Sequence, residues 1–194
     1  MALCLTAPAH AKERTLLVLG DSISAAYGMS LEEGWVAQLA DSLGGREPPI
    51  EVVNASISGE TTGGALGRLP ALLHEHQPEV VLIELGGNDG LRGFPPATFR
   101  QNLIELARQS SDAGARVIIL PMEIPPNYGA RYAASFRESY PLAAEETGSL
   151  LAPFILDGIA TNPELMQGDG IHPKPEAQAA MLQNVLPAIK EALP

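Results

Sequence analysis

The sequence predicts one α/β domain built on a parallel β-sheet. Short apolar runs alternate along the chain with longer segments in which apolar residues recur at helical spacing. Strands and helices in alternation are joined by right-handed crossovers, which place helices on both faces of a parallel sheet. A chain of 194 residues is long enough for one domain with an ordinary core. Since no repeat, low-complexity segment or linker divides the sequence, we expect residues 12–194 to form this single domain.

Each strand is expected from a short apolar run bounded by turn residues, the pattern of a strand that is buried on both faces. In chain order the strands are Leu16–Leu19, Ile50–Val53, Glu79–Leu85, Ala115–Leu120 and Ser149–Ala152. The apolar spacing predicts helices at Leu31–Leu43, Thr62–His76, Phe99–Ala113, Ala130–Thr147 and Glu176–Leu193.

Three residue types mark details of these helices. Gly44-Gly45 should end the first helix. Pro70 lacks an N–H group and should interrupt the second helix. Trp35 is expected to anchor the first helix in the core, with a contact to a ligand as the alternative.

Composition and charge exclude several classes of function. Twelve Lys and Arg against 23 Asp and Glu give a formal net charge of −11, whereas nucleic-acid binding requires a clustered basic surface. Cys4 is the only cysteine, so an intrachain disulfide cannot form and no C-x-x-C metal or redox spacing occurs. No apolar stretch reaches the length of a transmembrane helix. We therefore expect no nucleic-acid partner and no stable membrane insertion.

Residues 1–11 are treated apart from the fold. They are apolar and end in Ala9-His10-Ala11, a small-x-small pattern that suits signal peptidase. A basic n-region is missing and the apolar stretch is short, so we interpret the segment as an incomplete secretory signal, with a disordered tail as the alternative. Export would place the mature protein, beginning near Lys12, in the periplasm or outside the cell.

Four loops with unusual polar content each follow a predicted strand. Any one of them is an ordinary turn or surface loop. In an open α/β fold, however, the carboxyl ends of the strands lie along one edge of the sheet, where ligands bind. We therefore expect four loops to meet at one site: Gly20-Asp21-Ser22, Ser58-Gly59, Gly86-Gly87-Asn88-Asp89 and Asp169–His172.

The residue types in these loops suit nucleophilic catalysis. Ser22 is the candidate nucleophile, and it requires a general base, for which His172 is the candidate. Asp169 precedes the histidine by three residues and can orient its imidazole. A tetrahedral oxyanion would need donors, which the backbone N–H groups of Ser22 and Gly59 and the side-chain amide of Asn88 can provide.

Other polar residues have simpler interpretations. Asp21 is expected to order its loop by backbone hydrogen bonds rather than to transfer protons, and Asp89 to be a turn residue that positions Asn88. His74 and His76 are two residues apart, so they point in different directions from a helix and do not predict a metal site. We expect neither a metal nor a cofactor.

The four loops also carry a family resemblance. GDSIS at 20–24, Gly59 within NASISGETT, GGND at 86–89 and DGIHP at 169–173 look like the four blocks of the SGNH (GDSL) hydrolases. NDGLRG at 88–93 and PNYG at 126–129 resemble the bacterial thioesterase I/protease I/lysophospholipase (arylesterase) branch. The resemblance extends from about Arg14 to the C-terminus, and all four block residues are present.

This resemblance implies a flavodoxin-like α/β/α sandwich with a five-stranded parallel sheet, and metal-free hydrolysis through an acyl-enzyme. The implied substrates are acyl-CoA thioesters, lysophospholipids, and aryl and alkyl esters, hydrolysed in the periplasm by a protein that we expect to be a monomer. In that branch the loop after GGND, here Gly90–Pro96, covers the acyl chain, so Leu91 and Phe94 are candidate substrate-binding residues.

Two other functions fit parts of the sequence. A carbohydrate deacetylase would use the same site residues, but the apolar Leu91–Phe94 segment disfavours it. A flavodoxin-like module binding a nucleotide or FMN is disfavoured by the acidic charge and by the lack of a Walker-type loop. The sequence leaves two roles open: Pro121–Pro126 as a connector or a groove wall, and Arg92 as a solvated residue or a contact to a substrate carboxylate or phosphate.

Overall fold

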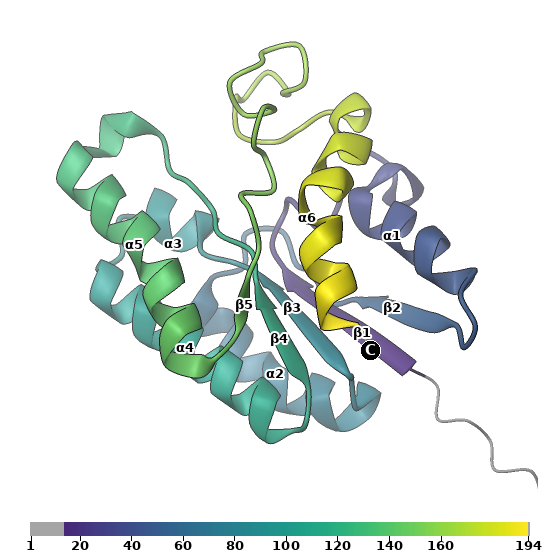
Figure 1. Cartoon of the computed structure of the whole chain (residues 1–194). Coiled ribbons are helices and arrows are strands. Elements are labelled where there is room, and N and C mark those ends of the chain that lie inside the picture. Colours follow the sequence, from purple (N-terminus) through teal and green to yellow (C-terminus); the bar gives the residue numbers. More distant parts are fainter. Residues whose placement is uncertain (1–13, 194) are drawn as a thin grey trace, which may run out of the picture.

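A parallel sheet of five strands, in the order β2-β1-β3-β4-β5, lies at the centre of the fold (Figure 1). The computed structural model describes residues 14–193, so the segment interpreted as a signal remnant lies outside the described residues. The strands are β1 (Arg14–Gly20), β2 (Ile50–Asn54), β3 (Val80–Glu84), β4 (Arg116–Ile119) and β5 (Leu150–Leu151). The predicted five-stranded parallel sheet is confirmed.

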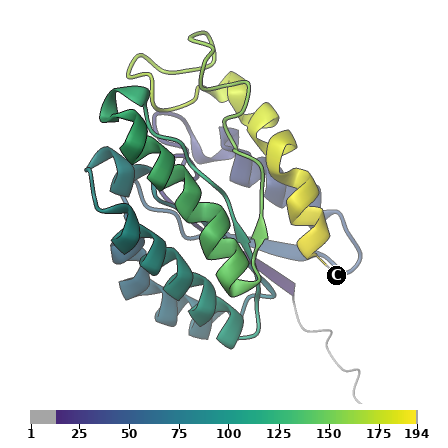
Figure 2. The same cartoon turned by 60° about the vertical axis from the view of Figure 1, so that its left-hand side comes forward.

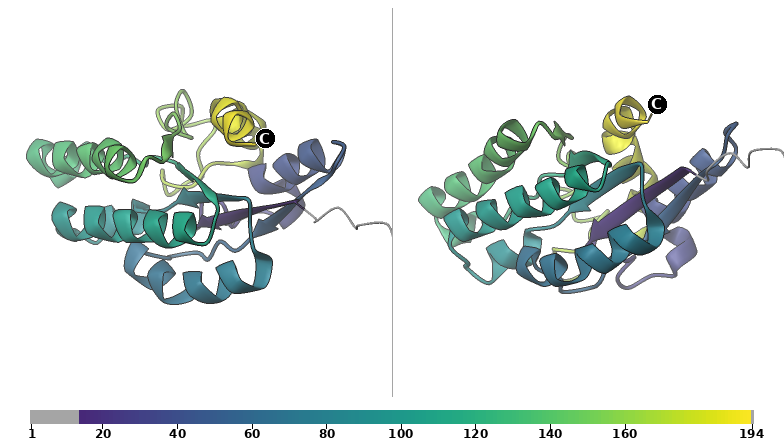
Figure 3. Two further views of the ribbon diagram at one scale, coloured as in Figure 1. Left: turned by 60° about the horizontal axis from the view of Figure 1, so that its bottom comes forward. Right: turned by 90° about the horizontal axis from the view of Figure 1, so that it is seen from below.

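Helices cover both faces of the sheet (Figures 2 and 3). On one face, α1 (Trp35–Gly44) packs beside α6 (Gln178–Ala192). On the other face, α2 (Thr62–His76), α4 (Pro96–Asp112) and α5 (Ala130–Thr147) form a row. This is the three-layer α/β/α arrangement that alternating strands and helices predict.

The core consists of the apolar residues of the sheet and of the helix faces that pack on it. All five residues of β3 are buried. The rings of Phe99 and Phe136 stack with their centroids 4.6 Å apart, and Tyr140 packs edge-on against both. Trp35 has no exposed surface, so its predicted role as a core anchor is confirmed and the alternative of a ligand contact is wrong.

The helices differ from the sequence prediction at two places, one at Pro70 and one at Gly34. Pro70 does not interrupt α2, which runs from Thr62 to His76. Because Pro70 lies on the exposed side of the helix, water can replace its missing N–H group as the partner of the carbonyl four residues earlier. The segment expected as one helix at Leu31–Leu43 is instead a 3-10 turn, η1 (Leu31–Glu33), followed by α1, with Gly34 in extended conformation between them.

Two more short helices occur where the sequence predicts a turn and the start of a long helix. The Gly-Gly-Asn-Asp segment forms the beginning of α3 (Gly87–Leu91). The last predicted helix is divided into a 3-10 turn, η3 (Pro175–Ala177), and α6. Another 3-10 turn, η2 (Pro126–Tyr128), lies in the proline-rich segment after β4.

The long segment between β5 and α6 rises beyond the carboxyl ends of the strands and forms the upper end of the molecule in Figure 1. Because the carboxyl ends of the parallel strands lie at the same edge of the sheet, this segment approaches the loops that follow β1 and β3. Among the described residues, no helix is both long enough and apolar enough to cross a membrane.

Candidate active site

Ser22 lies in a tight turn directly after β1. Gly20, the last residue of β1, has no room for a side chain, because an added Cβ would lie 2.8 Å from the side chains of Ser24 and Ser56. The Asp21 carboxylate accepts a hydrogen bond from the N–H of Ile23 at 3.0 Å, which closes an Asx-type turn around the serine. The ordering role predicted for Asp21 is therefore observed, and Ser22 is half-buried at the end of a central strand.

Three side chains from two distant loops form a hydrogen-bonded series. The Ser22 Oγ lies 2.9 Å from Nε2 of His172, across a sequence separation of 150 residues. The other ring nitrogen of His172, Nδ1, lies 2.6 Å from Oδ2 of Asp169. Both distances are within hydrogen-bonding range, so the structure brings together the nucleophile, the base and the orienting carboxylate that the sequence predicts.

The Asp169 carboxylate is held by its own loop. Its Oδ1 accepts the backbone N–H groups of Ile171, at 2.9 Å, and His172, at 3.0 Å. Partial burial acts to raise the pKa of Asp169, but the hydrogen bonds from the His172 side chain and from these two backbone groups outweigh it and lower the pKa to about 2. Asp169 is therefore ionised throughout the neutral pH range and can stabilise a positive charge on the imidazole.

The sequence analysis names three hydrogen-bond donors for an oxyanion, and the structure shows which of their N–H groups are already bonded. In the described part of the chain, the backbone N–H groups of Ser22 and Gly59 donate to no protein acceptor. The side-chain amide of Asn88 donates one hydrogen to Oδ2 of Asp21 at 3.0 Å, which leaves its second hydrogen free. The sequence prediction names these donors, and the structure leaves each of them with an uncommitted N–H.

A pair of buried carboxyl groups lies beneath the serine turn. Glu84, at the end of β3, is completely buried and accepts a hydrogen bond from Ser24 Oγ at 2.7 Å. Burial and the neighbouring Asp21 carboxylate raise the pKa of Glu84 well above its ordinary value. Burial also raises the pKa of Asp21 to about 6, although the N–H of Ile23, His172 and the amide of Asn88 act to lower it. The sequence analysis did not single out Glu84, because a single acidic residue at the end of an apolar strand has no distinctive pattern.

Helix α3 is bonded to the first residue of α2 and to the loop before it. Both carboxylate oxygens of Asp89 accept hydrogen bonds from Thr62, one from its N–H at 3.0 Å and one from its hydroxyl. The guanidinium of Arg92 donates to the carbonyl of Gly59 at 2.9 Å. Asp89 thus anchors α3 as a whole, whereas the side chain of Asn88 is held by Asp21. In this structure the Arg92 side chain binds the protein's own backbone.

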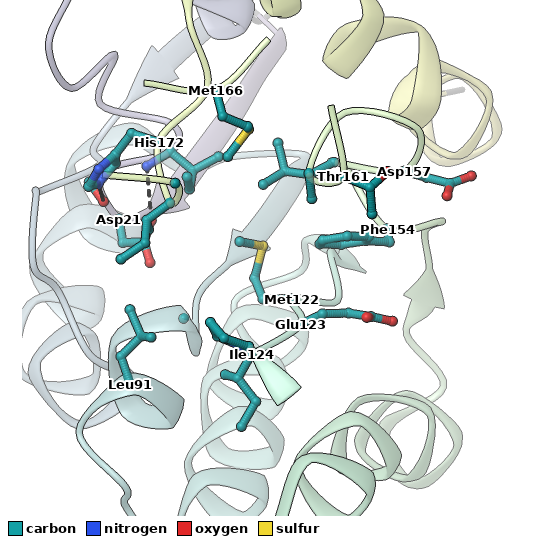
Figure 4. A pocket seen from close by; sticks show the side chains of 18 of the residues that line it. Asp21, Leu91, Met122, Glu123, Ile124, Phe154, Asp157, Thr161, Met166 and His172 are labelled. Atoms are coloured by element: carbon teal, nitrogen blue, oxygen red, sulfur yellow. Dashed lines mark hydrogen bonds between the residues drawn. The ribbon is translucent and has the colours of Figure 1, made fainter. Parts of the chain in front are cut away.

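An apolar pocket of about 510 Å³ opens beside Ser22, within the size range of small-molecule sites. Figure 4 shows Asp21 and His172 at one end of it, with Met122 near the middle and Phe154 further along. Other apolar side chains in the lining are Ile23, Leu91, Ile124, Leu156, Met166 and Ile171. The site therefore joins a hydroxyl–imidazole pair to a volume that suits an apolar chain.

The pocket answers one question that the sequence leaves open and shows where the two candidate substrate-binding residues lie. The Pro121–Pro126 segment forms a wall, since Met122 and Ile124 line the pocket. Leu91 also lines it, whereas Phe94 is not among the lining residues and is 39% exposed. Phe154 and Met166 were not predicted, because an isolated apolar residue in a loop is as often packed into the core as exposed to a ligand.

The two histidines of α2 take no part in this site. His74 and His76 lie in the last turn of the helix, at the end remote from Thr62. Within residues 14–193, no three His, Cys, Asp or Glu side chains gather in a way that could hold a metal ion.

Comparisons with known proteins agree with the fold and with the family resemblance of the sequence. Residues 18–180 match the model of the GDSL-like Lipase/Acylhydrolase family. An arylesterase of Vibrio mimicus is 50% identical over 175 residues, which are 90% of this chain and 87% of that protein. Thioesterase 1/protease 1/lysophospholipase L1 of Escherichia coli K12 is 47% identical over 164 residues, 84% of this chain and 77% of that protein.

The crystal structure of TesA matches with a TM-score of 0.90 and 49% identity, over 93% of this chain and all of the TesA chain. The protein is thus a hydrolytic enzyme whose parallel β-sheet has the strand order of flavodoxin. It belongs to the GDSL-like lipase/acylhydrolase family, as the four sequence blocks indicate.

Proposed function

We propose that this protein is a serine hydrolase that cleaves carboxylic esters and thioesters through an acyl-enzyme at Ser22. The observation that carries the proposal is the series from Ser22 through His172 to Asp169 at the end of an apolar pocket. The relatives named arylesterase and thioesterase 1/protease 1/lysophospholipase L1 support this choice of substrates.

In the acylation step, His172 Nε2 takes the proton of Ser22 Oγ while the oxygen attacks the carbonyl carbon of the substrate. The N–H groups of Ser22 and Gly59 and the free amide hydrogen of Asn88 donate to the oxyanion that forms. The intermediate then expels an alcohol or a thiol, to which the imidazolium returns the proton. The acyl group remains on Ser22 as an ester.

In the deacylation step, water replaces the alcohol or thiol beside His172. The imidazole takes a proton from the water as its oxygen attacks the acyl-enzyme, and the same donors stabilise the second oxyanion. Collapse of this intermediate releases the carboxylic acid and returns the proton to Ser22 Oγ. Asp169 stays ionised and compensates the charge on the imidazolium in both steps.

The apolar lining of the pocket supports the hydrolysis of substrates with apolar acyl groups. Leu91, Met122 and Phe154 offer apolar surface to such a chain, and burial of that surface favours binding. A carbohydrate deacetylase would need to place only an acetyl group there. We therefore expect acyl groups longer than acetate to be preferred.

The test is hydrolysis of p-nitrophenyl esters from acetate to long acyl chains, with Ser22→Ala as the inactive variant and Ser111→Ala, an exposed serine in α4, as the matched control. Activity that increases beyond acetate and is lost only in the first variant supports the proposal. Activity on acetate alone would favour the deacetylase.

A second experiment identifies the nucleophile directly. A fluorophosphonate transfers its phosphonyl group to an activated serine and releases fluoride, and mass spectrometry then locates the adduct. We expect one adduct, on the peptide that contains Ser22. A wild-type protein that is neither labelled nor active would contradict the proposal and favour a binding module.

We also propose that the protein is exported to the periplasm and acts there as a monomer. The support for export is the apolar residues 1–11 with their small-x-small end. Cell fractionation tests the location and size-exclusion chromatography tests the monomer.

A further inference from the structure

The Ser22 turn and the His172 loop come from opposite ends of the chain, and Gln167 links them. Its side-chain Nε2 donates to the carbonyl of Tyr27 at 2.8 Å and to the carbonyl of Pro173 at 3.0 Å. An amide nitrogen has two hydrogens, so both are used, one on each segment. Two carbonyl acceptors also fix which end of the amide is the nitrogen.

The backbone of Gln167 reinforces this link within the histidine loop. Its N–H donates to the carbonyl of His172 at 2.7 Å, and its carbonyl accepts from Gly170. Met166 and Pro173 pair beside it as an isolated antiparallel bridge. Gln167 is therefore fixed to the residues on both sides of His172 and reaches from there to Tyr27.

The Tyr27 end of the link is shaped for this contact. Ala26 and Gly28, on either side of Tyr27, have positive φ angles of 55° and 79°. A positive φ is unfavourable for alanine and persists where the surroundings impose it. At Gly28 an added Cβ would lie 2.5 Å from Oε1 of Gln167, so a glycine makes room for the amide.

Tyr27 also contacts the imidazole itself. The ring centroids of Tyr27 and His172 lie 4.3 Å apart, and the planes are inclined by 34°. Apart from the Ser22–His172 contact, the Gln167–Tyr27 bond is the only hydrogen bond between described residues 20–30 and 160–174. The bond therefore holds an aromatic face against the imidazole.

We propose that Gln167 is a positioning residue, which clamps the His172 loop to the Ser22 turn and so sets the distance between Nε2 and Oγ. The proposal rests on the proposed function of this site. Gln167 does not touch the reacting atoms. It acts through Tyr27 and the backbone of His172, and its loss should affect the chemical step more than the binding of substrate.

The central experiment compares two substitutions of Gln167. Gln167→Met keeps the length of the side chain but removes both donors, whereas Gln167→Lys keeps a donor. A displacement of the base on the order of 1 Å costs up to about 100-fold in rate. We expect Gln167→Met to lower kcat for p-nitrophenyl butyrate by about 10- to 100-fold, with KM nearly unchanged, and Gln167→Lys to retain most of the activity.

Gln101→Met, an exposed glutamine in α4, is the matched control and should behave as wild type. Fluorophosphonate labelling of Ser22 should slow in Gln167→Met by the same factor as kcat. A purely structural role would lower thermal stability without this selective loss. Wild-type kcat in Gln167→Met, or an equal loss in Gln167→Lys, would overturn the clamp.

A second route perturbs the same contact from its other side. Gly28→Ala should displace the Gln167 amide and lower kcat. Because both changes break one link, the double variant with Gln167→Met should lose no more than the more affected single variant. Multiplying losses would overturn the proposal. An inactive and unlabelled wild-type protein would instead contradict the proposed function, so the two failures are distinguishable.

Discussion

Ser22 and His172, the proposed nucleophile and its proposed base, are held in different ways. Ser22 follows the central strand β1, between Asp21, which is 2% exposed, and Ile23, which is 5% exposed. His172 lies in a long segment after β5, an edge strand of two residues, and its partner Asp169 has a side chain that is 40% exposed. The sheet thus fixes the serine, whereas hydrogen bonds within its own loop and the bond from Gln167 to Tyr27 hold the histidine. We therefore expect substitutions in the His172 loop to leave the protein folded but to abolish its catalytic activity.

The largest expected effect tests the histidine side. In Asp169→Asn the amide cannot hold the imidazole in the required tautomer, and kcat should fall about 10,000-fold. His172→Ala should lose at least as much. Because the Asp169 side chain is 40% exposed and lies in a loop outside the core, the unfolding temperature should change little. Ester hydrolysis and thermal denaturation measure the two effects, and an active Asp169→Asn protein would contradict the comparison.

The next effect concerns a donor held from the serine side. Asn88→Ala removes one proposed donor to the oxyanion, and loss of such a donor lowers kcat by about 100- to 1,000-fold. KM should change little, because the bond forms mainly in the transition state. Asn127→Ala, an exposed asparagine in η2, is the control. Equal kcat in both variants would remove Asn88 from the mechanism.

A third prediction concerns the burial of charge beneath Ser22. Burial raises the pKa of Asp21 to about 6 from a usual value of 3.8. The folded state therefore binds this proton more tightly than the unfolded state, so the stabilisation is complete below about pH 4 and is lost as the pH rises through about 6. Asp21→Asn removes this dependence and should gain up to about 3 kcal/mol in unfolding free energy between pH 4 and pH 8 relative to wild type.

Urea denaturation at pH 4 and pH 8 measures this difference. Asp169→Asn provides the contrast, since the pKa of Asp169 is lowered rather than raised, and its variant should show no gain at the higher pH. If the free energy of unfolding of Asp21→Asn, relative to wild type, did not increase from pH 4 to pH 8, ionisation of the buried Asp21 carboxylate would not be what destabilises the wild-type protein at the higher pH.

The smallest expected effect distinguishes two neighbouring apolar residues. Leu91 lines the pocket and Phe94 does not. Leu91→Ala should lower kcat/KM for long acyl esters by about tenfold relative to acetate, since a small change in apolar contact area has an effect of this size. Phe94→Ala should leave the ratio unchanged. An equal change in both variants would mean that the pocket extends beyond its described lining.

The sequence predicts the parts of this molecule that depend on local patterns. Strand β3 is buried on both faces and is recognisable as a continuous apolar run. The loops that carry Ser22 and His172 are recognisable because glycine and polar residues follow such runs. Pro70 was misjudged because a local rule ignores that the proline faces solvent and that the helix packs on the sheet.

The features that the sequence analysis missed depend on tertiary contacts. Glu84 becomes unusual only when folding buries it next to Asp21, and Gln167 only when Tyr27 lies within hydrogen-bonding distance of it. The lining of the pocket also depends on tertiary contacts, since Met122 and Phe154 come from separate loops that meet only in the folded chain. A single sequence records the residues of such contacts but not their proximity.

The separation of 150 residues between Ser22 and His172 has a consequence for biosynthesis. Ser22 is made 150 residues before His172, so a growing chain carries the proposed nucleophile for most of that synthesis without the imidazole proposed to activate it. The same holds for any fragment cut off before the final loop. A chain that stops before His172 lacks the base of the proposed mechanism, so we expect it to have no esterase activity.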